Sequence, residues 1–155
     1  MRDYDWAGWS GWHSLAKMHA GGFPMINDGA GAYAIAATNL KIPRVAGKDR
    51  YGLLYVGESN DMRSRLQAFY DSIERGHQTH VAGWQYNLVE FERCAPVETL
   101  RVRWLPTKTR QEAQEAQTKL LYAYVSNHCE LPPLNCSLGH ALTRDFGFRL
   151  VRKGA

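Results

Sequence analysis

The sequence predicts an α/β fold, a small sandwich in which a central three-stranded antiparallel sheet is flanked by helices. Runs of aromatic and β-branched residues between turn residues predict strands at about residues 32–38, 51–57 and 99–105. Apolar residues at helical spacing predict helices at about 60–75 and 110–126. With 155 residues, the chain has the length of one domain.

The start of the chain differs from the rest. Residues 1–28 form an extension rich in tryptophan, ahead of a main domain at residues 29–155. Trp6, Trp9 and Trp12 recur at every third position. We expect them to pack in the core or in a dimer interface, because a buried tryptophan contributes a large apolar area. Stacking on nucleic-acid bases is the alternative.

The first two strands carry near-mirrored tripeptides, GAY at 31–33 and YVG at 55–57. We expect the two strands to pair as a hairpin, which places their tyrosines side by side. The segment between them, residues 37–48, contains Arg44 and Lys48 and is longer than a tight turn. It is either a binding insertion or simply a loop.

The first helix has recognisable ends. Asn60 or Asp61 is a suitable N-cap, and Gly76 follows the last apolar residue of the pattern. Arg63 and Arg65 lie on its first turns.

The segment after this helix holds His77 and His80. It continues into a run at 84–92 in which apolar residues recur. This run predicts a further strand, built on Trp84, Tyr86, Leu88, Val89 and Phe91.

The second helix begins with a capping box, because Thr109 is an N-cap residue and Glu112 stands three positions later. At about 100° per residue, Gln117 falls in the middle of the apolar stripe formed by Ala113, Ala116, Leu120, Leu121 and Tyr124. A polar residue centred on an apolar face needs a reason. It is either a buried amide with hydrogen-bond partners in the core or part of a functional site.

Taken together, these elements resemble the GIY-YIG nuclease family, whose name describes the two tripeptides. In that family an arginine follows the tyrosine of the second tripeptide by ten positions, as Arg65 follows Tyr55 here. The family then has a helix with a glutamate before a Leu-Ile pair, and a proline-rich turn that ends in asparagine. This chain has Leu-Leu at 120–121 and PPLN at 132–135 in those places, so the resemblance covers about residues 29–137.

The resemblance implies metal-dependent hydrolysis of DNA phosphodiester bonds, with one Mg²⁺ or Mn²⁺ ion per active site. Tyr33 would then be the general base, Tyr55 would orient it or the attacking water, and Arg65 would stabilise the charge of the transition state. A free tyrosine has a pKa of about 10, so nearby metal and arginine charge must help it to act as a base. Asn135 corresponds to the asparagine that organises the site, and a simple turn residue after two prolines is the alternative.

One departure from the family concerns its metal-binding glutamate, whose position is occupied by Gln117. A neutral amide is a poor substitute for a carboxylate on a hard cation. We therefore expect Gln117 to mark the metal position and the chain to be impaired as an enzyme, whether the residue is natural or was introduced to trap a substrate complex. Glu58 is a second departure, because several relatives carry a lysine there.

Other residues are candidates for catalysis or for contact with DNA. Some relatives use a histidine near His77 to contact the phosphate or relay a proton, and a solvated loop histidine is the alternative. The formal net charge of +4 and a pI of about 9.1 suit a polyanionic partner. We expect DNA contacts from Arg63, Arg44, Lys48, Lys108, Tyr70 and His80.

No apolar stretch approaches the roughly 20 residues that cross a bilayer. The N-terminus shows no basic-then-apolar signal pattern, so we expect a cytoplasmic protein with no membrane partner. Three cysteines argue against a disulfide framework and are expected to be buried. The alternative is a zinc site made from His128, Cys129, Cys136 and His140.

The leading expectation is a metal-dependent DNA endonuclease, of a compact restriction or other defence or mobile-element type, with a homodimer left open. A DNA-repair nuclease is an alternative in the same class. A non-catalytic DNA-binding module on this fold is an alternative from another class, although such a module should also have lost Tyr33, Tyr55, Arg65 and Asn135. A protein-interaction domain is a third alternative, which predicts no salt-dependent affinity for DNA.

Overall fold

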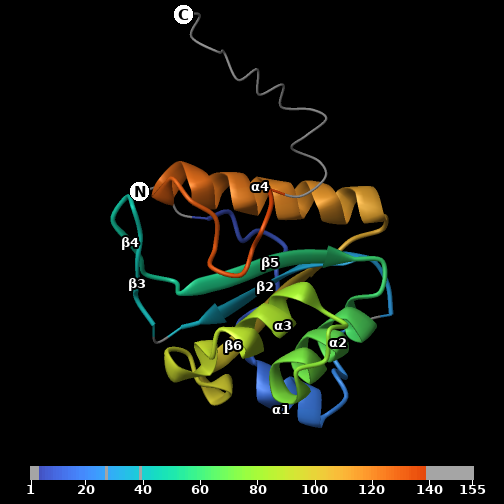
Figure 1. Ribbon diagram of the computed structural model, residues 1–155. Helices are drawn as coiled ribbons and strands as arrows, with labels where there is room; N and C mark the ends of the chain where they lie inside the picture. Colours follow the sequence, from blue (N-terminus) through green and yellow to red (C-terminus); the bar gives the residue numbers. More distant parts are fainter. Residues whose placement is uncertain (1–3, 27, 39, 139–155) are drawn as a thin grey trace, which may run out of the picture.

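A computed structural model describes residues 4–26, 28–38 and 40–138 (Figure 1). Two short 3₁₀ turns, Phe91–Arg93 and Val97–Thr99, precede the last strand. The strands and helices are, in chain order, β1 (His13–Ser14), α1 (Leu15–Ala20), β2 (Gly31–Ala37), β3 (Ile42–Pro43), β4 (Lys48–Asp49), β5 (Leu53–Ser59), α2 (Met62–Arg75), α3 (Val81–Leu88), β6 (Leu100–Pro106) and α4 (Arg110–His128).

The main sheet is antiparallel and has the strand order β1-β6-β2-β5. The mixed α/β architecture is confirmed, but the sheet has four strands rather than three, because the two-residue β1 pairs with β6. The predicted pairing of β2 with β5 is also confirmed, although the small β3–β4 sheet lies between them in the chain. Figure 1 shows α4 on one face of the main sheet and α1, α2 and α3 on the other. The strand β5 forms one edge of the sheet.

Local capping signals set the ends of the two long helices. The side chain of Asp61 accepts a hydrogen bond from the Ser64 N–H at the start of α2, and Gly76 ends that helix in the left-handed region at φ 67°. The Thr109 hydroxyl accepts from the Glu112 N–H at the start of α4, at 3.2 Å. Both helices therefore begin where the sequence predicts.

The predicted strand at 84–92 is wrong, because most of that segment belongs to helix α3. The buried residues of α3 include Ala82 and Tyr86, which are four positions apart, whereas Leu88 and Val89 are exposed. Gly83 lets the helix approach α2 so closely that an added Cβ would lie 2.6 Å from the Phe69 carbonyl oxygen. Packing against α2 thus overrides the apolar pattern that favoured a strand.

The sheet separates two hydrophobic cores, one beneath α1–α3 and one beneath α4. The predicted packing of Trp6, Trp9 and Trp12 is confirmed, since all three are partly buried against the core on the α4 side. The Arg103 guanidinium lies 4.1 Å from the Trp6 ring centroid and 5.2 Å from that of Trp12. The aromatic extension therefore covers part of one face of the sheet.

The cysteines do not follow the expected pattern, because Cys94, Cys129 and Cys136 are free and exposed. His128 is buried, with its ring nitrogens near the Tyr4 hydroxyl and the Ala46 carbonyl oxygen. The fourth residue of the zinc alternative, His140, lies outside the described residues. No helix in the described part of the chain is long and apolar enough to cross a membrane.

Candidate active site

A pocket of about 370 Å³ lies at the β5 edge of the sheet. Tyr55 and Glu58 reach it from β5, Arg65 from α2 and Gln117 from α4, and the segment at 134–137 forms another wall. These groups come from both helical layers and from the loop after α4, so the site is assembled from segments far apart in the sequence. The pocket combines a phenol, a guanidinium, a carboxylate and two amides.

The two tyrosines of the mirrored tripeptides lie over a glycine. In the antiparallel register Tyr33 stands opposite Gly57, and the ring centroids of Tyr33 and Tyr55 are 5.9 Å apart. A Cβ added to Gly57 would lie 2.5 Å from Tyr33 Cζ and 2.7 Å from Tyr55 Cε1. Only a residue without a side chain allows both phenols to occupy these positions.

Tyr33 is fully buried and does not line the pocket, whereas Tyr55 does. The Tyr33 hydroxyl is 2.8 Å from Nε2 of His80, which is also buried. His80 Nδ1 accepts a hydrogen bond from the Gly83 N–H at 3.4 Å, so the neutral ring carries its proton on Nε2 and donates it to the Tyr33 oxygen. Burial, with a smaller effect of the Arg65 charge, lowers the pKa of His80 to about 3 and keeps the ring neutral.

The positive charge of Arg65 acts on both phenols. Burial raises the pKa of Tyr33 and of Tyr55, and in both cases the Arg65 charge opposes this rise. A hydrogen bond from Tyr33 also lowers the pKa of Tyr55. Burial remains the largest effect, so the pKa of Tyr55 stays above its ordinary value of 10, and the contacts with Tyr33 and Arg65 only reduce that rise.

The backbone of Val56, on the edge strand β5, is hydrogen-bonded by side chains in the way that a neighbouring strand would bond it. Asn135 accepts from the Val56 N–H and donates to the Val56 carbonyl oxygen, both at 2.9 Å. Gln117 Nε2 donates to the same carbonyl at 3.1 Å, and the Leu134 N–H donates to the Leu54 carbonyl at 2.9 Å. A carboxylate at 117 would have no hydrogen to give to Val56, so this contact requires an amide.

Glu58 is the charged pocket residue that the family resemblance did not assign to the site. Its side chain is only 12% exposed, and Oε1 lies 3.4 Å from a guanidinium nitrogen of Arg110. Oε2 is enclosed and has no hydrogen-bond partner among the described residues. The sequence could have indicated that Glu58 belongs to the site, because it directly follows Gly57 and strand alternation places it on the same face as Val56.

Arg63 and Tyr70 do not line this pocket. Arg63 lies on α2 and forms an ion pair with Asp28, in which Nε is 3.0 Å from the carboxylate, and its guanidinium also donates to the Ile26 carbonyl. Tyr70 is buried and stacks on His19, with ring centroids 3.8 Å apart.

The other predicted contact residues also lie outside the pocket lining. His77 is exposed in the loop between α2 and α3, and Lys48 and Lys108 are exposed elsewhere. Arg44 forms an ion pair with Glu130, in which Nε is 3.0 Å from Oε1, and this pair joins the β3–β4 sheet to the segment after α4. Of the predicted residues, the structure thus brings together Tyr55, Arg65, Gln117 and Asn135 in the pocket, with Tyr33 and His80 directly behind.

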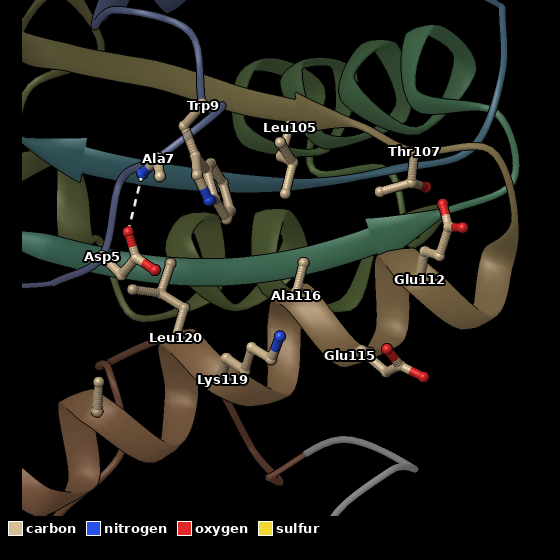
Figure 2. Close-up of a pocket in the computed structure, with 11 residues that line it drawn as sticks. Asp5, Ala7, Trp9, Leu105, Thr107, Glu112, Glu115, Ala116, Lys119 and Leu120 are labelled. Carbon is tan, nitrogen blue, oxygen red and sulfur yellow. Dashed lines mark hydrogen bonds between the residues drawn. The ribbon is translucent and has the colours of Figure 1, made fainter.

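Figure 2 shows a second pocket, of about 380 Å³, between the N-terminal segment and α4. Its carboxylates already accept hydrogen bonds locally: Asp5 and Glu112 from backbone N–H groups, and Glu115 from the Gln111 side chain. Within residues 4–26, 28–38 and 40–138, no three His, Cys, Asp or Glu side chains are grouped so that they could hold a metal ion. The pocket at the β5 edge is the stronger candidate, because it holds predicted site residues and because one carboxylate oxygen of its Glu58 has no hydrogen-bond partner among the described residues.

Comparisons with protein-family models, with curated proteins and with solved structures found no match for this chain. The fold and the pocket define a mixed α/β protein with a polar site at the edge of an antiparallel sheet.

Proposed function

We propose that this protein is a metal-dependent DNA endonuclease with a GIY-YIG fold, which hydrolyses phosphodiester bonds with one Mg²⁺ or Mn²⁺ ion per site. One observation supports this proposal above all: four positions singled out by the resemblance lie in a single pocket although they come from three separate parts of the chain. They are Tyr55, Arg65, Gln117 and Asn135. The central sheet of the proposed fold consists of β5, β2 and β6, with β1 as an addition at its edge.

The charges in the pocket suit a phosphodiester. Hydrolysis places negative charge on the phosphate oxygens, and the Arg65 guanidinium in the pocket wall can hold that charge through two parallel N–H donors. A divalent cation, when bound, neutralises the same charge and binds mainly oxygen ligands. Gln117 uses its amino group on Val56, so its carbonyl oxygen is the atom that it can offer to a cation.

The positions of the two tyrosines favour Tyr55, rather than Tyr33, as the group that takes a proton from water. Tyr55 faces the pocket, whereas Tyr33 is fully buried behind it. Because the neutral His80 ring donates to the Tyr33 oxygen, the hydrogen of the Tyr33 hydroxyl remains available to the neighbouring Tyr55, and the contact with Tyr33 lowers the pKa of Tyr55 in part. In this arrangement Tyr33 and His80 position Tyr55, and the charge of Arg65 also acts to lower its pKa.

The test is plasmid cleavage with Mg²⁺ or Mn²⁺ by this chain, Arg65→Ala and Arg63→Ala, with the same three proteins carrying Gln117→Glu if the unaltered chain does not cut. Arg63 is a matched control, because it lies on the same helix but is paired with Asp28 outside the pocket. We expect Arg65→Ala to slow cleavage by at least about 100-fold and Arg63→Ala to retain most of it. Equal loss in the two variants, or none in either, would contradict the assigned role of the pocket.

A non-catalytic DNA-binding module is the second candidate, and the bond from Gln117 to Val56 favours it because it gives the amide a structural role. Cleavage by Gln117→Glu separates the alternatives. If only this variant cuts, the amide impairs a nuclease site; if the natural chain also cuts, the amide is compatible with catalysis. If neither cuts but both bind DNA with an affinity that falls with salt, the protein is a binding module.

A further inference from the structure

We propose that Glu58 provides the carboxylate that holds a divalent cation in the pocket, in place of a carboxylate at position 117. This inference rests on the proposed function, which identifies the reaction that the cation would serve. The evidence for the cation site itself comes from the surroundings of Glu58. Glu58 follows the second tripeptide directly and reaches the pocket from β5, across from Gln117 on α4.

Glu58 is a nearly buried acid whose hydrogen bonding is incomplete. Arg110 approaches only Oε1, at the long distance of 3.4 Å, and the Arg110 side chain is itself 56% exposed. Oε2 is enclosed and has no partner among the described residues. A buried carboxylate oxygen without a donor is costly, so the arrangement calls for a second positive group, at the oxygen that Arg110 does not reach.

Another buried acid shows how this fold treats a carboxylate that has only a structural role. Asp49 is completely buried, and its oxygens accept hydrogen bonds from the backbone N–H groups of Tyr51, Gly52 and Leu53 at 2.8, 3.2 and 2.8 Å. No comparable set of donors surrounds Glu58 among the described residues. The contrast points to a ligand-binding role for Glu58.

The chemistry of the pocket matches a cation that keeps part of its water shell. Mg²⁺ is commonly held by one or two carboxylates together with waters and substrate phosphates, so a single acid in an open polar pocket is sufficient. Glu58 supplies the acid, and the Gln117 carbonyl oxygen is a neutral oxygen ligand in the same pocket. The terminal torsion of a glutamate is broad and nearly two-fold, so a half-turn about it exchanges the oxygen near Arg110 with the enclosed one.

The experiment measures Mn²⁺ binding by electron paramagnetic resonance in the absence of DNA. Glu58→Gln keeps the shape of the side chain and removes its charge, and Glu115→Gln is the matched control, because Glu115 is an exposed acid on α4 that lines the second pocket and not this one. We expect Glu58→Gln to weaken Mn²⁺ binding by at least about tenfold and Glu115→Gln to leave it unchanged. Adding Gln117→Glu to Glu58→Gln should restore binding, because it returns a carboxylate to the pocket.

Unchanged Mn²⁺ affinity in Glu58→Gln, or no binding by the natural chain, would overturn the inference. If Glu58→Gln fails to fold, Glu58→Asp in a folded protein provides the same test, because its shorter carboxylate should bind Mn²⁺ more weakly than the natural chain does. Binding of Mn²⁺ that depends on Glu58, without cleavage of DNA by either this chain or Gln117→Glu, would leave the cation site in place and refute the nuclease proposal instead.

Discussion

Gly57→Ala perturbs the candidate site through a single methyl group. An added Cβ would lie 2.5 Å from Tyr33 Cζ, 2.6 Å from the Tyr33 oxygen and 2.7 Å from Tyr55 Cε1. Carbon atoms in good contact are about 3.5–4.0 Å apart, so at least one ring must move by about 1 Å. Because Tyr33 is fully buried, its ring has little room to move without disturbing its bond to His80.

The expected cost combines two terms. Overpacking a close-packed region costs about 1–3 kcal/mol, and a weakened hydrogen bond between Tyr33 and His80 adds about 1 kcal/mol. We therefore expect Gly57→Ala to lower the free energy of unfolding by about 3 kcal/mol. Catalysis should suffer as well, because a displacement of about 1 Å in an active site reduces a rate by about 100-fold.

Urea unfolding and plasmid cleavage measure these two effects in the same protein. With a slope of about 1–3 kcal/mol per molar urea, the unfolding midpoint should fall by about 1–3 M. Gly29→Ala is the control, because an added Cβ there meets nothing within 4 Å. A Gly57→Ala protein with the same urea midpoint and cleavage rate as Gly29→Ala would refute the claim that the two phenols require a glycine at this position.

Two further predictions concern the surroundings of the pocket. Asn135→Ala removes both hydrogen bonds to Val56 and should lower the free energy of unfolding, measured in urea, by about 2 kcal/mol. The control Asn87→Ala removes one hydrogen bond, to a carbonyl on α2, and should lower it by about half as much. Equal losses of stability in the two variants would contradict the bracing role of Asn135. The pKa of His80 is lowered from 6.5 to about 3, so below pH 6.5 the unfolded chain binds more protons than the folded one, and the free energy of unfolding should fall as the pH falls. Between pH 7 and pH 5 this contribution is about 2 kcal/mol, and His80→Gln should reduce the fall by about that amount. A fall of the same size in the natural chain and the variant would show that His80 is not held neutral.

The features of the fold that the sequence predicts correctly depend on local interactions. The N-caps at Asp61 and Thr109 and the stop at Gly76 involve residues within one turn of the helix they end. Helix α3 was missed because the close contact between Gly83 and the Phe69 carbonyl, which positions it, is a tertiary one. Apolar residues alone did not distinguish this helix from a strand.

The same limit explains what the sequence reveals of the candidate site. Spacing along one strand and one helix brings Tyr55 and Arg65 together, and both line the pocket. Spacing does not show that Tyr33 lies behind Tyr55, since its depth follows from the central place of β2 between β6 and β5. The surroundings of Glu58 were equally hidden, because they depend on how α4 packs against β5.

The hydrogen bonds between Val56 and Asn135 join positions 79 residues apart. Closing a loop of that length lowers the conformational entropy of the chain before the new contacts can stabilise it. Such contacts therefore tend to form late in folding. We therefore expect the wall of the pocket at 134–137 to be added after β5, β6 and α4 are in place. If the protein cuts DNA, a nascent or partly unfolded chain has no complete site, and its hydrolytic activity begins only when folding is finished.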